Sequence, residues 1–498
     1  MTTLSLQKSF LAALLTATLL AVPVFLRTAA APPQGEAQAK LEKLESQPGT
    51  TASDQVDLAV TVYNSNIGLV RDVRQVTLPA GEFQLRFMDI AAAINPATVH
   101  LRSLSDPAKL GILEQNYEYD LLDPQKLLQK YVGREVTLMR AHMESGSTKW
   151  DEVKAVLLAY NNGPVWKIGN EIVTGMGADS YRFPQLPENL YSRPTLLWTL
   201  ENSGARRHRV EASYLTGNIS WSADYVLTVG RDDKAGDLDG WVTLVNNSGT
   251  AFKNARLQLV AGELNRVVSG MVQEFKMDAA RAAKAAPQFQ QEAFSEYHLY
   301  SLSRRTSIFD KETKQISLLA GSGVPIEKGY VVDGQQYYYR NVQSPGAPIK
   351  DPVKVFYTFK NDEKSGLGMP LPAGIVRVYQ ADSKGGVLFA GEDRISHTPK
   401  DERISLHIGN AFDIVAERKQ TDFKKLSDRL YEMEYEITLR NHKDAPITVE
   451  VNEPIGGDWQ IIESTHKWTK TAAFAAQFKI PVAKDSASVL RYRVRVRW

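Results

Sequence analysis

Apolar and polar side chains alternate over long stretches of this 498-residue sequence, and this period of two most strongly limits the folds it can adopt. In the segment ISWSADYVL, which begins at Ile219, the alternation places Trp221 and Tyr225 on one side of an extended chain and Asp224 on the other. A strand with one apolar side buries that side against a second layer of structure. The pattern therefore predicts a mainly β protein built from packed sheets.

The tetrapeptide Thr-Leu-x-Asn occurs three times, and each copy ends an apolar strand pattern. The copies are Thr199–Asn202, Thr243–Asn246 and Thr438–Asn441. A short polar segment follows each copy, and then a second alternating segment returns. Asparagine tolerates left-handed backbone, and its side chain bonds to its own turn. We predict that the motif marks strand ends in immunoglobulin-like hairpins and carries no chemistry.

Interruptions of the alternating pattern divide the sequence into five segments. We predict a signal peptide at 1–31, a flexible tether at 32–56, an N-terminal β domain at 57–190, a central β-sandwich at 191–394 and a C-terminal immunoglobulin-like β-sandwich at 395–498. Four short strand patterns within 134–176 indicate a small β-barrel inserted in the N-terminal domain. An Ala-rich stretch near 271–296 favours a helical insertion in the central domain. The predicted fold class is mainly β: multi-domain immunoglobulin-like β-sandwiches with a small inserted β-barrel and one Ala-rich helical excursion.

The N-terminal segment has the layout of a secretory signal peptide. Lys8 precedes an apolar run over 10–26, and Ala29 and Ala31 follow at the spacing of a cleavage site. The alternative is an uncleaved anchor helix, but Pro23 and the small residues favour cleavage. We therefore expect a periplasmic or secreted protein, with the outer membrane as the less favoured location.

The charge balance disfavours polyanionic partners. The chain has 59 Lys and Arg and 57 Asp and Glu; the predicted signal peptide holds Lys8 and Arg27 and no acid, so its removal leaves 57 of each. A formally neutral protein has no electrostatic reason to bind nucleic acid or anionic lipid. We expect no nucleic-acid partner, and membrane contact only through an uncleaved signal anchor.

The sequence has no cysteine and no familiar catalytic motif. The lack of cysteine excludes disulfides, thiolate metal sites and a cysteine nucleophile. The eight histidines are scattered, and no His-Glu-x-x-His, Gly-x-Ser-x-Gly or Gly-rich phosphate loop is present. The Asp-rich segment 231–241 suggests a calcium loop, but its glycines favour a hairpin turn. We predict no metal, no cofactor and no catalytic residue.

Aromatic residues on alternating strands are the candidates for ligand binding. Trp221, Tyr225 and Trp241 could form a carbohydrate platform with Asp224 beside them, although an aromatic stripe with period two is more often core. Trp459, at the end of a Gly-Gly-Asp-Trp turn, has the same two interpretations. These five residues are the predicted ligand-binding set.

The C-terminal segment LRYRVRVRW alternates four arginines with apolar residues and ends on Trp498. Outer-membrane β-barrels also end on an aromatic residue, but they need successive strands of about ten residues with apolar outer faces. Charged loops break the strands of this chain. We favour a final sandwich strand with the arginines outward and Trp498 closing the core.

Many sequence blocks resemble the domain of unknown function 4139 family. They include LYSRPTLLWTLENSG, SYLTGNISWSADYVL, VRVYQADSKGGVLFAGEDRISHTPKDE and YEITLRNHKDAPITVEVNEPIGGDWQI, and the likeness covers roughly Leu190 to Trp498. The earlier block LAVTVYNSNIGLVRDVRQVTLPAGEFQLRF is similar to the N-terminal region of mucoidy-inhibitor-A-like proteins, without their long coiled coil. The resemblance implies an exported bacterial β-sandwich protein with no established reaction, and the name suggests a link to exopolysaccharide.

These features favour a non-enzymatic binding or scaffolding protein of the bacterial cell envelope, with an envelope protein or glycan as partner. The alternative from another class is an envelope hydrolase that acts on glycan or peptide through carboxylates in an interdomain cleft. An outer-membrane β-barrel is the third interpretation. The sequence predicts no particular oligomeric state.

Overall fold

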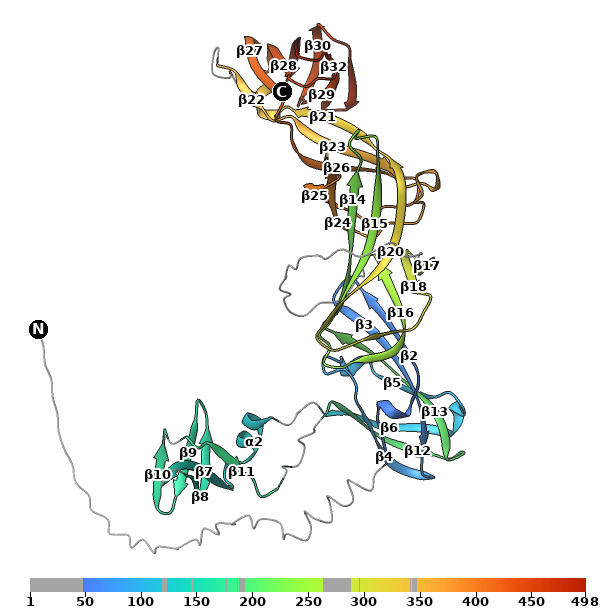
Figure 1. Ribbon diagram of the computed structural model, residues 1–498, viewed down its shortest axis with the longest axis vertical. Coiled ribbons are helices and arrows are strands. Elements are labelled where there is room, and N and C mark those ends of the chain that lie inside the picture. The colour runs from blue at the N-terminus through green and yellow to red at the C-terminus, as the bar shows by residue number, and fades with distance from the viewer. Residues whose placement is uncertain are drawn as a thin grey trace, which may run out of the picture. The chain divides into compact units, whose positions relative to one another are not determined.

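The computed structural model describes residues 48–498, except 119–122, 145–146, 176, 186, 188–192, 263–287, 295, 341, 343–346 and 383. The predicted signal peptide, most of the tether and most of the helical insertion therefore lie outside the described residues. Strands make up almost all of the regular structure (Figure 1), and α2 (Pro124–Lys130) is the only α-helix of the described part. Within that part, no helix has the length and apolarity needed to cross a membrane. The prediction of a mainly β, multi-sheet protein is confirmed.

Two sheets combine strands from the first and second thirds of the chain. The N-terminal sheet has the order β1 (Gly49–Thr50), β4 (Gly81–Met88), β12 (Thr195–Asn202) and β6 (Leu110–Glu118). The eight-stranded sheet has the order β17 (Phe289–Phe294), β18 (Tyr297–Leu302), β16 (Phe252–Ala261), β2 (Gln55–Tyr63), β3 (Ile67–Thr77), β13 (Arg207–Gly217) and β5 (His100–Ser103), with β19 (Thr306–Ile308) paired to β16. Residues 49–54 of the predicted tether thus form β1 and the 3₁₀ helix η1 (Ala52–Asp54).

Three further sheets use the later part of the chain. The central sheet has the order β20 (Glu312–Pro325), β15 (Ala235–Asn246), β14 (Ile219–Val229), β24 (Gly374–Ala381) and β25 (Val387–Ile395). The six-stranded sheet has the order β26 (Arg403–Asn410), β23 (Lys354–Lys360), β21 (Glu327–Asp333), β29 (Ile447–Pro454), β32 (Ala475–Val482) and β31 (Trp468–Ala472). The C-terminal sheet has the order β22 (Ile349–Asp351), β27 (Ile414–Ser427), β28 (Leu430–Asn441), β33 (Ser486–Arg497) and β30 (Asp458–Ser464). Short 3₁₀ helices connect some of these strands: η2 (Pro96–Thr98), η3 (Pro107–Lys109), η4 (Gln336–Tyr339) and η5 (Glu363–Ser365).

The inserted segment is an open sheet with one helix. Its order is β10 (Glu171–Thr174), β9 (Pro164–Ile168), β8 (Ser147–Tyr160), β7 (Glu135–Glu144) and β11 (Ser180–Arg182), which leaves β10 and β11 at the two edges. The prediction of a small barrel is wrong in this respect, because the short edge strands do not pair with each other. Asp123 begins α2 by accepting hydrogen bonds from the Gln125 and Lys126 amides at 2.8 and 3.0 Å.

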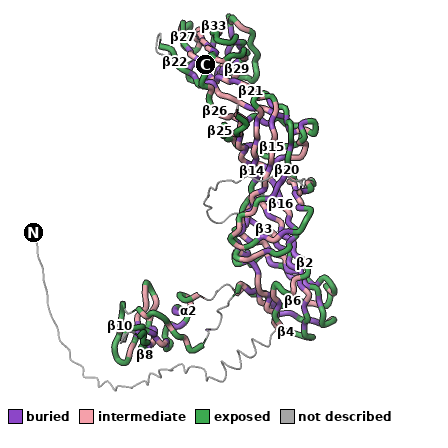
Figure 2. Tube along the Cα trace, viewed as in Figure 1, coloured by how far each residue is buried: buried purple, intermediate pink, exposed green. Residues whose placement is uncertain are grey.

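Among the described residues, buried apolar side chains form three clusters. Figure 2 shows buried positions, in purple, interspersed with more exposed ones along the chain. The first cluster joins the N-terminal, eight-stranded and central sheets, and it includes Tyr357 of β23 and Leu406 of β26. The second lies between the C-terminal sheet and strands β21, β29 and β32. The six-stranded sheet therefore contributes side chains to two cores. The third cluster belongs to the insertion and includes Trp166.

Strand pairing crosses both predicted domain boundaries. β4 pairs with β12 across residue 190, and β23 pairs with β26 across residue 394. The helical insertion predicted near 271–296 lies outside the described residues up to 287, and its later part contains the strand β17. β17 pairs with β18 in an antiparallel hairpin, so tertiary pairing determines the structure of this stretch.

The repeated asparagines hold turns from inside the protein. Asn202, Asn246 and Asn441 are each 0–1% exposed. The Asn441 Nδ2 donates to the carbonyls of Ala445 and Ala483 at 2.9 Å, and its Oδ1 accepts from the Lys443 amide at 3.0 Å. Asn202 and Asn246 repeat this pattern. The predicted role in turns is thus supported by the contacts, but none of the three has a positive φ. The side-chain amide holds the turn, and the backbone is not left-handed.

A fourth asparagine shares this role. Asn361 ends the sequence Thr-Phe-Lys-Asn after β23 and is fully buried. Its Nδ2 donates to the Met369 and Pro399 carbonyls at 2.8 and 2.9 Å, and its Oδ1 accepts from the Gly368 amide at 3.2 Å. This copy does not match the Thr-Leu-x-Asn motif, because phenylalanine replaces leucine.

Candidate functional site

The central sheet has one buried face and one outward face, and the predicted residues divide between them. Trp221 and Tyr225 lie on the buried face and are 3% and 0% exposed. The Trp221 indole donates to the Val260 carbonyl at 3.3 Å, and the Tyr225 hydroxyl donates to the Pro372 carbonyl at 2.8 Å. Burial raises the pKa of Tyr225 well above its usual value. Packing against the second layer therefore encloses these two rings, which corresponds to the core alternative for an aromatic stripe with period two.

Asp224 and Trp241 lie together on the outward face. β14 and β15 are antiparallel neighbours, and their register sets Asp224 directly opposite Trp241. Both residues are half-buried, as expected for the solvent side of central strands. The alternation that buries Trp221 thus turns Asp224 outward.

A row of polar contacts crosses all five strands of the outward face. We call Gln315, Thr243, Asp224, Arg377 and Glu392 the polar row; they lie on β20, β15, β14, β24 and β25 in that order. Gln315 Nε2 donates to Thr243 Oγ1 at 3.2 Å, and Thr243 Oγ1 donates to Asp224 Oδ2 at 2.7 Å. Arg377 donates from Nη1 to Asp224 Oδ1 at 3.1 Å, and its Nε lies 3.4 Å from Glu392 Oε2. Each strand thus contributes one group to a continuous polar network.

Aromatic side chains lie along one side of the polar row. Trp241 flanks it on β15, and Tyr379 packs edge-on against Phe389 two residues beyond Arg377, with ring centroids 5.6 Å apart. A bulge at Ala390 of β25 brings Phe389 opposite Tyr379, and the adjacent Gly391 has a φ of 153°. A Cβ on Gly391 would lie 2.3 Å from the Ile408 carbonyl oxygen, so only glycine fits. Phe389 is 56% exposed, which makes its ring available to a ligand.

Trp459 lies in the C-terminal core, away from this face. It is 8% exposed, its indole donates to the Ala473 carbonyl at 2.9 Å, and its ring packs against Trp468. The sandwich and Trp468 therefore cover the ring of Trp459.

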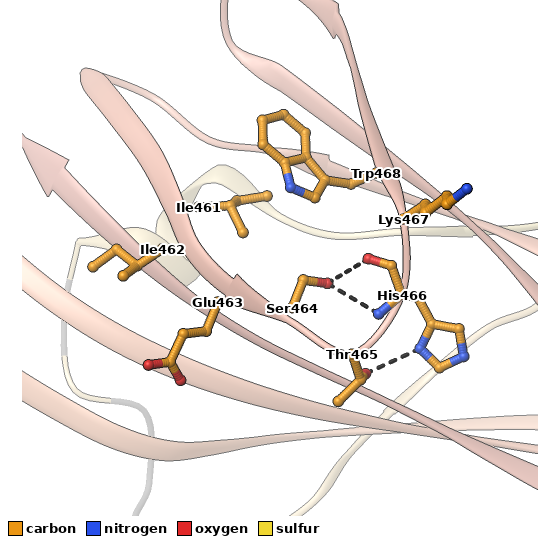
Figure 3. Close-up of a pocket in the computed structure, with 8 residues that line it drawn as sticks. All are labelled: Ile461, Ile462, Glu463, Ser464, Thr465, His466, Lys467 and Trp468. Atoms are coloured by element: carbon orange, nitrogen blue, oxygen red, sulfur yellow. Dashed lines mark hydrogen bonds between the residues drawn. The ribbon is translucent and has the colours of Figure 1, made fainter.

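A surface hollow of about 520 Å³ lies beside Trp468, at the corner where the chain passes from β30 to β31 (Figure 3). Eight consecutive residues, Ile461–Trp468, line it. Ser464 Oγ bridges the amide and carbonyl of His466 at 3.2 and 2.7 Å, which holds the bend closed. One segment thus forms the whole hollow, whereas five strands converge on the polar row.

The Asp-rich segment 231–241 forms a hairpin turn, and the carboxylate of Asp233 accepts hydrogen bonds from three side chains outside the turn. Lys328 Nζ donates to Asp233 at 2.8 Å, and the Tyr357 hydroxyl and Gln380 Nε2 donate to it at 2.6 Å. Asp233 has a φ of 57°, in keeping with a tight turn. Protein donors therefore occupy this carboxylate and tie the turn to β21, β23 and β24. In the described residues, no group of three or more His, Asp and Glu is placed to hold a metal ion.

The outward face presents hydrogen-bonding groups in fixed positions. Asp224 and Glu392 both contact Arg377, so their oxygens act as hydrogen-bond acceptors within a fixed network. The period-two pattern pointed to Asp224 and Trp241, but nothing in it pointed to the other members of the row, which are Arg377, Glu392, Gln315 and Thr243. β14 pairs in parallel with β24, which comes about 150 residues later in the chain, and no local sequence pattern predicts that pairing.

Fold and face together define a multi-sheet β protein whose central sheet has an outward face of polar and aromatic side chains. The chain belongs to the family described as Domain of unknown function (DUF4139), which matches residues 210–498 and so includes the whole central and C-terminal sheets. The predicted family membership is confirmed, with a start near 210 in place of 190. No curated protein matches the chain.

Proposed function

We propose that the protein is an exported, non-enzymatic binding protein of the bacterial cell envelope, which holds a neutral glycan on the outward face of the central sheet. The observation that carries the proposal is the polar row with Trp241 and the Tyr379–Phe389 pair along the same side of it. The signal-peptide pattern at 1–31 supports export. The resemblance to mucoidy-inhibitor-A-like proteins is in keeping with an exopolysaccharide ligand.

The chemistry of the face matches a sugar chain. A pyranose ring has a flat C–H face, which stacks on an aromatic ring, and hydroxyls that donate to and accept from planar polar groups. The polar row offers carboxylate, guanidinium and amide groups in fixed positions, so a ligand meets a preorganised surface. From strand spacing, Trp241 and Tyr379 lie roughly 16 Å apart diagonally, a span that suits several sugar units.

The charges of the face favour a neutral ligand over an anionic one. Alternation along β15 places Asp237 and Asp239 on the same side as Trp241. Together with Asp224 and Glu392 they outnumber Arg377 and its neighbour Arg394 on β25. An anionic polymer would meet net negative charge, whereas sugar hydroxyls can donate to the carboxylates.

Affinity electrophoresis of the purified protein in gels containing a neutral glucan, a neutral mannan or an anionic uronate polymer tests the ligand. We expect retardation by a neutral polysaccharide, weakened about tenfold or more by Trp241→Ala or Arg377→Ala. Trp150→Ala is the matched control, because Trp150 is 52% exposed on β8 of the insertion. Equal loss in the control variant, or no retention in any gel, would contradict glycan binding.

Two further measurements test the class and the location. Reducing ends should not increase on prolonged incubation with the retained polysaccharide; turnover abolished by Asp224→Asn would establish a hydrolase instead. Fractionation of cells that produce the full chain should place it outside the cytoplasm, and deletion of 1–31 should keep it inside. A full chain found in the cytoplasm would contradict export.

A further inference from the structure

Strand β6 is an edge strand of unusual composition. The order of the N-terminal sheet places it at the edge, and among the described residues it pairs only with β12. An edge strand directs the N–H and C=O groups of alternate residues away from its sheet, where another chain can pair with them. With nine residues, β6 is long enough for such pairing.

The side chains of β6 lack the usual protection of an edge. The sequence LGILEQNYE contains no Lys, Arg or Pro, and Ile112 and Leu113 are 45% and 51% exposed. A bulge at Leu113 interrupts the register with β12, so the regular stretch runs from Glu114 to Glu118 with two apolar side chains before it. Exposed apolar groups next to an unpaired edge are typical of an interaction site.

The strand is held firmly in place by its side chains. The Trp198 indole donates to Gln115 Oε1 at 2.9 Å, and Gln115 Nε2 donates to the Pro96 carbonyl at 3.3 Å. The Tyr117 hydroxyl donates to the Ala92 carbonyl at 3.1 Å. Because these contacts anchor β6 on the core side, a partner segment would meet an ordered template and not a flexible one.

The charge of β6 indicates the chemistry of its partner. Its charged residues, Glu114 and Glu118, are both acidic. A second copy of the same strand would bring carboxylates against carboxylates, which is unfavourable for cross-strand neighbours. A different segment that carries Lys or Arg among apolar residues would pair its cations with these carboxylates.

We propose that β6 accepts an extended basic and apolar segment of another polypeptide, which adds to the N-terminal sheet as a fifth strand beside β6. Backbone hydrogen bonds along 114–118 would supply affinity, and Ile112 and Leu113 would contact the apolar side chains of the added strand. This surface is separate from the outward face of the central sheet and does not depend on glycan binding.

A defined peptide tests the proposal on the full chain. The probe is fluorescein-labelled Lys-Val-Thr-Val-Lys-Val-Thr-Val-Lys, with two companions: one with Glu in place of Lys, and one N-methylated on alternate amides. We expect binding of the basic peptide by fluorescence anisotropy, at least about tenfold weaker binding of both companions, and slower amide exchange within residues 111–117. Equal binding of the N-methylated peptide, or no change of exchange in β6, would overturn strand addition.

Substitutions locate the site. Ile112→Lys and Leu113→Lys should each weaken peptide binding at least about tenfold by adding a cation to the edge. Ile172→Lys is the control, since Ile172 is 70% exposed on β10, at the edge of the insertion sheet. Circular dichroism should be unchanged in all three variants. Concentration-dependent dimerisation that Ile112→Lys abolishes would show that a second copy occupies the edge, which would contradict the proposed partner.

Discussion

At the scale of single residues, buried asparagines connect strands through hydrogen bonds of their side-chain amides. Asn202, Asn246, Asn361 and Asn441 each join a carbonyl of their own turn or loop to one from a different segment. A buried amide that satisfies otherwise unpaired backbone groups stabilises the fold mainly because its loss leaves those groups without partners. Asparagine acts at these positions through its side-chain amide, and its tolerance of left-handed backbone plays no part in these turns.

Asn441→Ala tests this role. The change leaves the Ala445 and Ala483 carbonyls and the Lys443 amide without this partner in a buried place. We expect the free energy of unfolding to fall by about 2–4 kcal/mol, measured by urea denaturation. Asn410→Ala is the matched control, because Asn410 also ends a strand but is exposed. A similar small effect of both changes would contradict the proposed role.

At the scale of elements, a buried ion cluster joins four strands of the C-terminal part. Arg418 of β27 is 1% exposed; its Nε donates to Asp351 of β22 at 2.8 Å, and its Nη1 lies 2.8 Å from Glu453 of β29. The Tyr339 hydroxyl also donates to Glu453 and lies 2.7 Å from the Tyr492 hydroxyl of β33. Burial by itself lowers the pKa of Arg418, but Glu453 and the other neighbouring groups raise it well above its usual value. Arg418 therefore stays charged.

Arg418→Met should destabilise the protein by about 3–5 kcal/mol, because it leaves two buried carboxylates without a countercharge. Adding Asp351→Asn and Glu453→Gln to this variant should recover part of the loss. Urea unfolding of the single and triple variants, followed by tyrosine and tryptophan fluorescence, measures both effects. A triple variant less stable than Arg418→Met would show that the carboxylates have a role beyond pairing with Arg418.

At the scale of the whole molecule, contacts between distant segments join the predicted domains. Asp57 on β2 pairs with Arg256 on β16 at 2.5 Å and with Arg305, between β18 and β19, at 2.7 Å. Each of these pairs joins segments about 200 or more residues apart. Burial alone would raise the pKa of Asp57, but the hydrogen bond from Arg305 and the charges of both arginines lower it below its usual 3.8.

This lowered pKa predicts a pH-dependent contribution to stability. A carboxylate with a depressed pKa in the folded state stabilises the protein above its unfolded pKa, and this contribution is lost as the pH falls through the folded pKa. The stability difference between the parent and Asp57→Asn should therefore be present near neutrality and disappear as the pH falls from about 5 to below 3.8. We expect less than about 1 kcal/mol, because both arginines are well exposed. Urea unfolding at a series of pH values tests this; a difference that grows on acidification would contradict it.

The period-two alternation predicted most strands and the fold class, because the apolar residues that form the buried side of a strand alternate within its own short sequence. β14 and β28 match the predicted pattern closely. The alternation of the last strand also correctly turned its arginines outward: Arg491, Arg493 and Arg495 pair with Glu436, Glu434 and Glu432 of β28. Each pair lies directly opposite in the register. Trp498, 36% exposed, only partly covers the core it was expected to close.

The candidate site could be predicted only in part, because its residues come from strands that are far apart in the chain. Alternation separated Trp221 and Tyr225 from Asp224 and favoured burial of the aromatic side, and packing against a second layer did bury the two rings. Alternation could not show that Arg377 and Gln315 belong to the same row as Asp224, because the pairing of distant strands brings them there.

The sequence by itself determined most of the strands, the positions of the asparagine turns and the family, because the alternation and the Thr-Leu-x-Asn motif are patterns of close neighbours along the chain. The tertiary structure decided which strands meet: β14 beside β24, β2 beside β16, and β6 at an edge. Those pairings join segments up to about 200 residues apart, and backbone hydrogen bonds, which carry no sequence code, make them. The polar row exists only because of them.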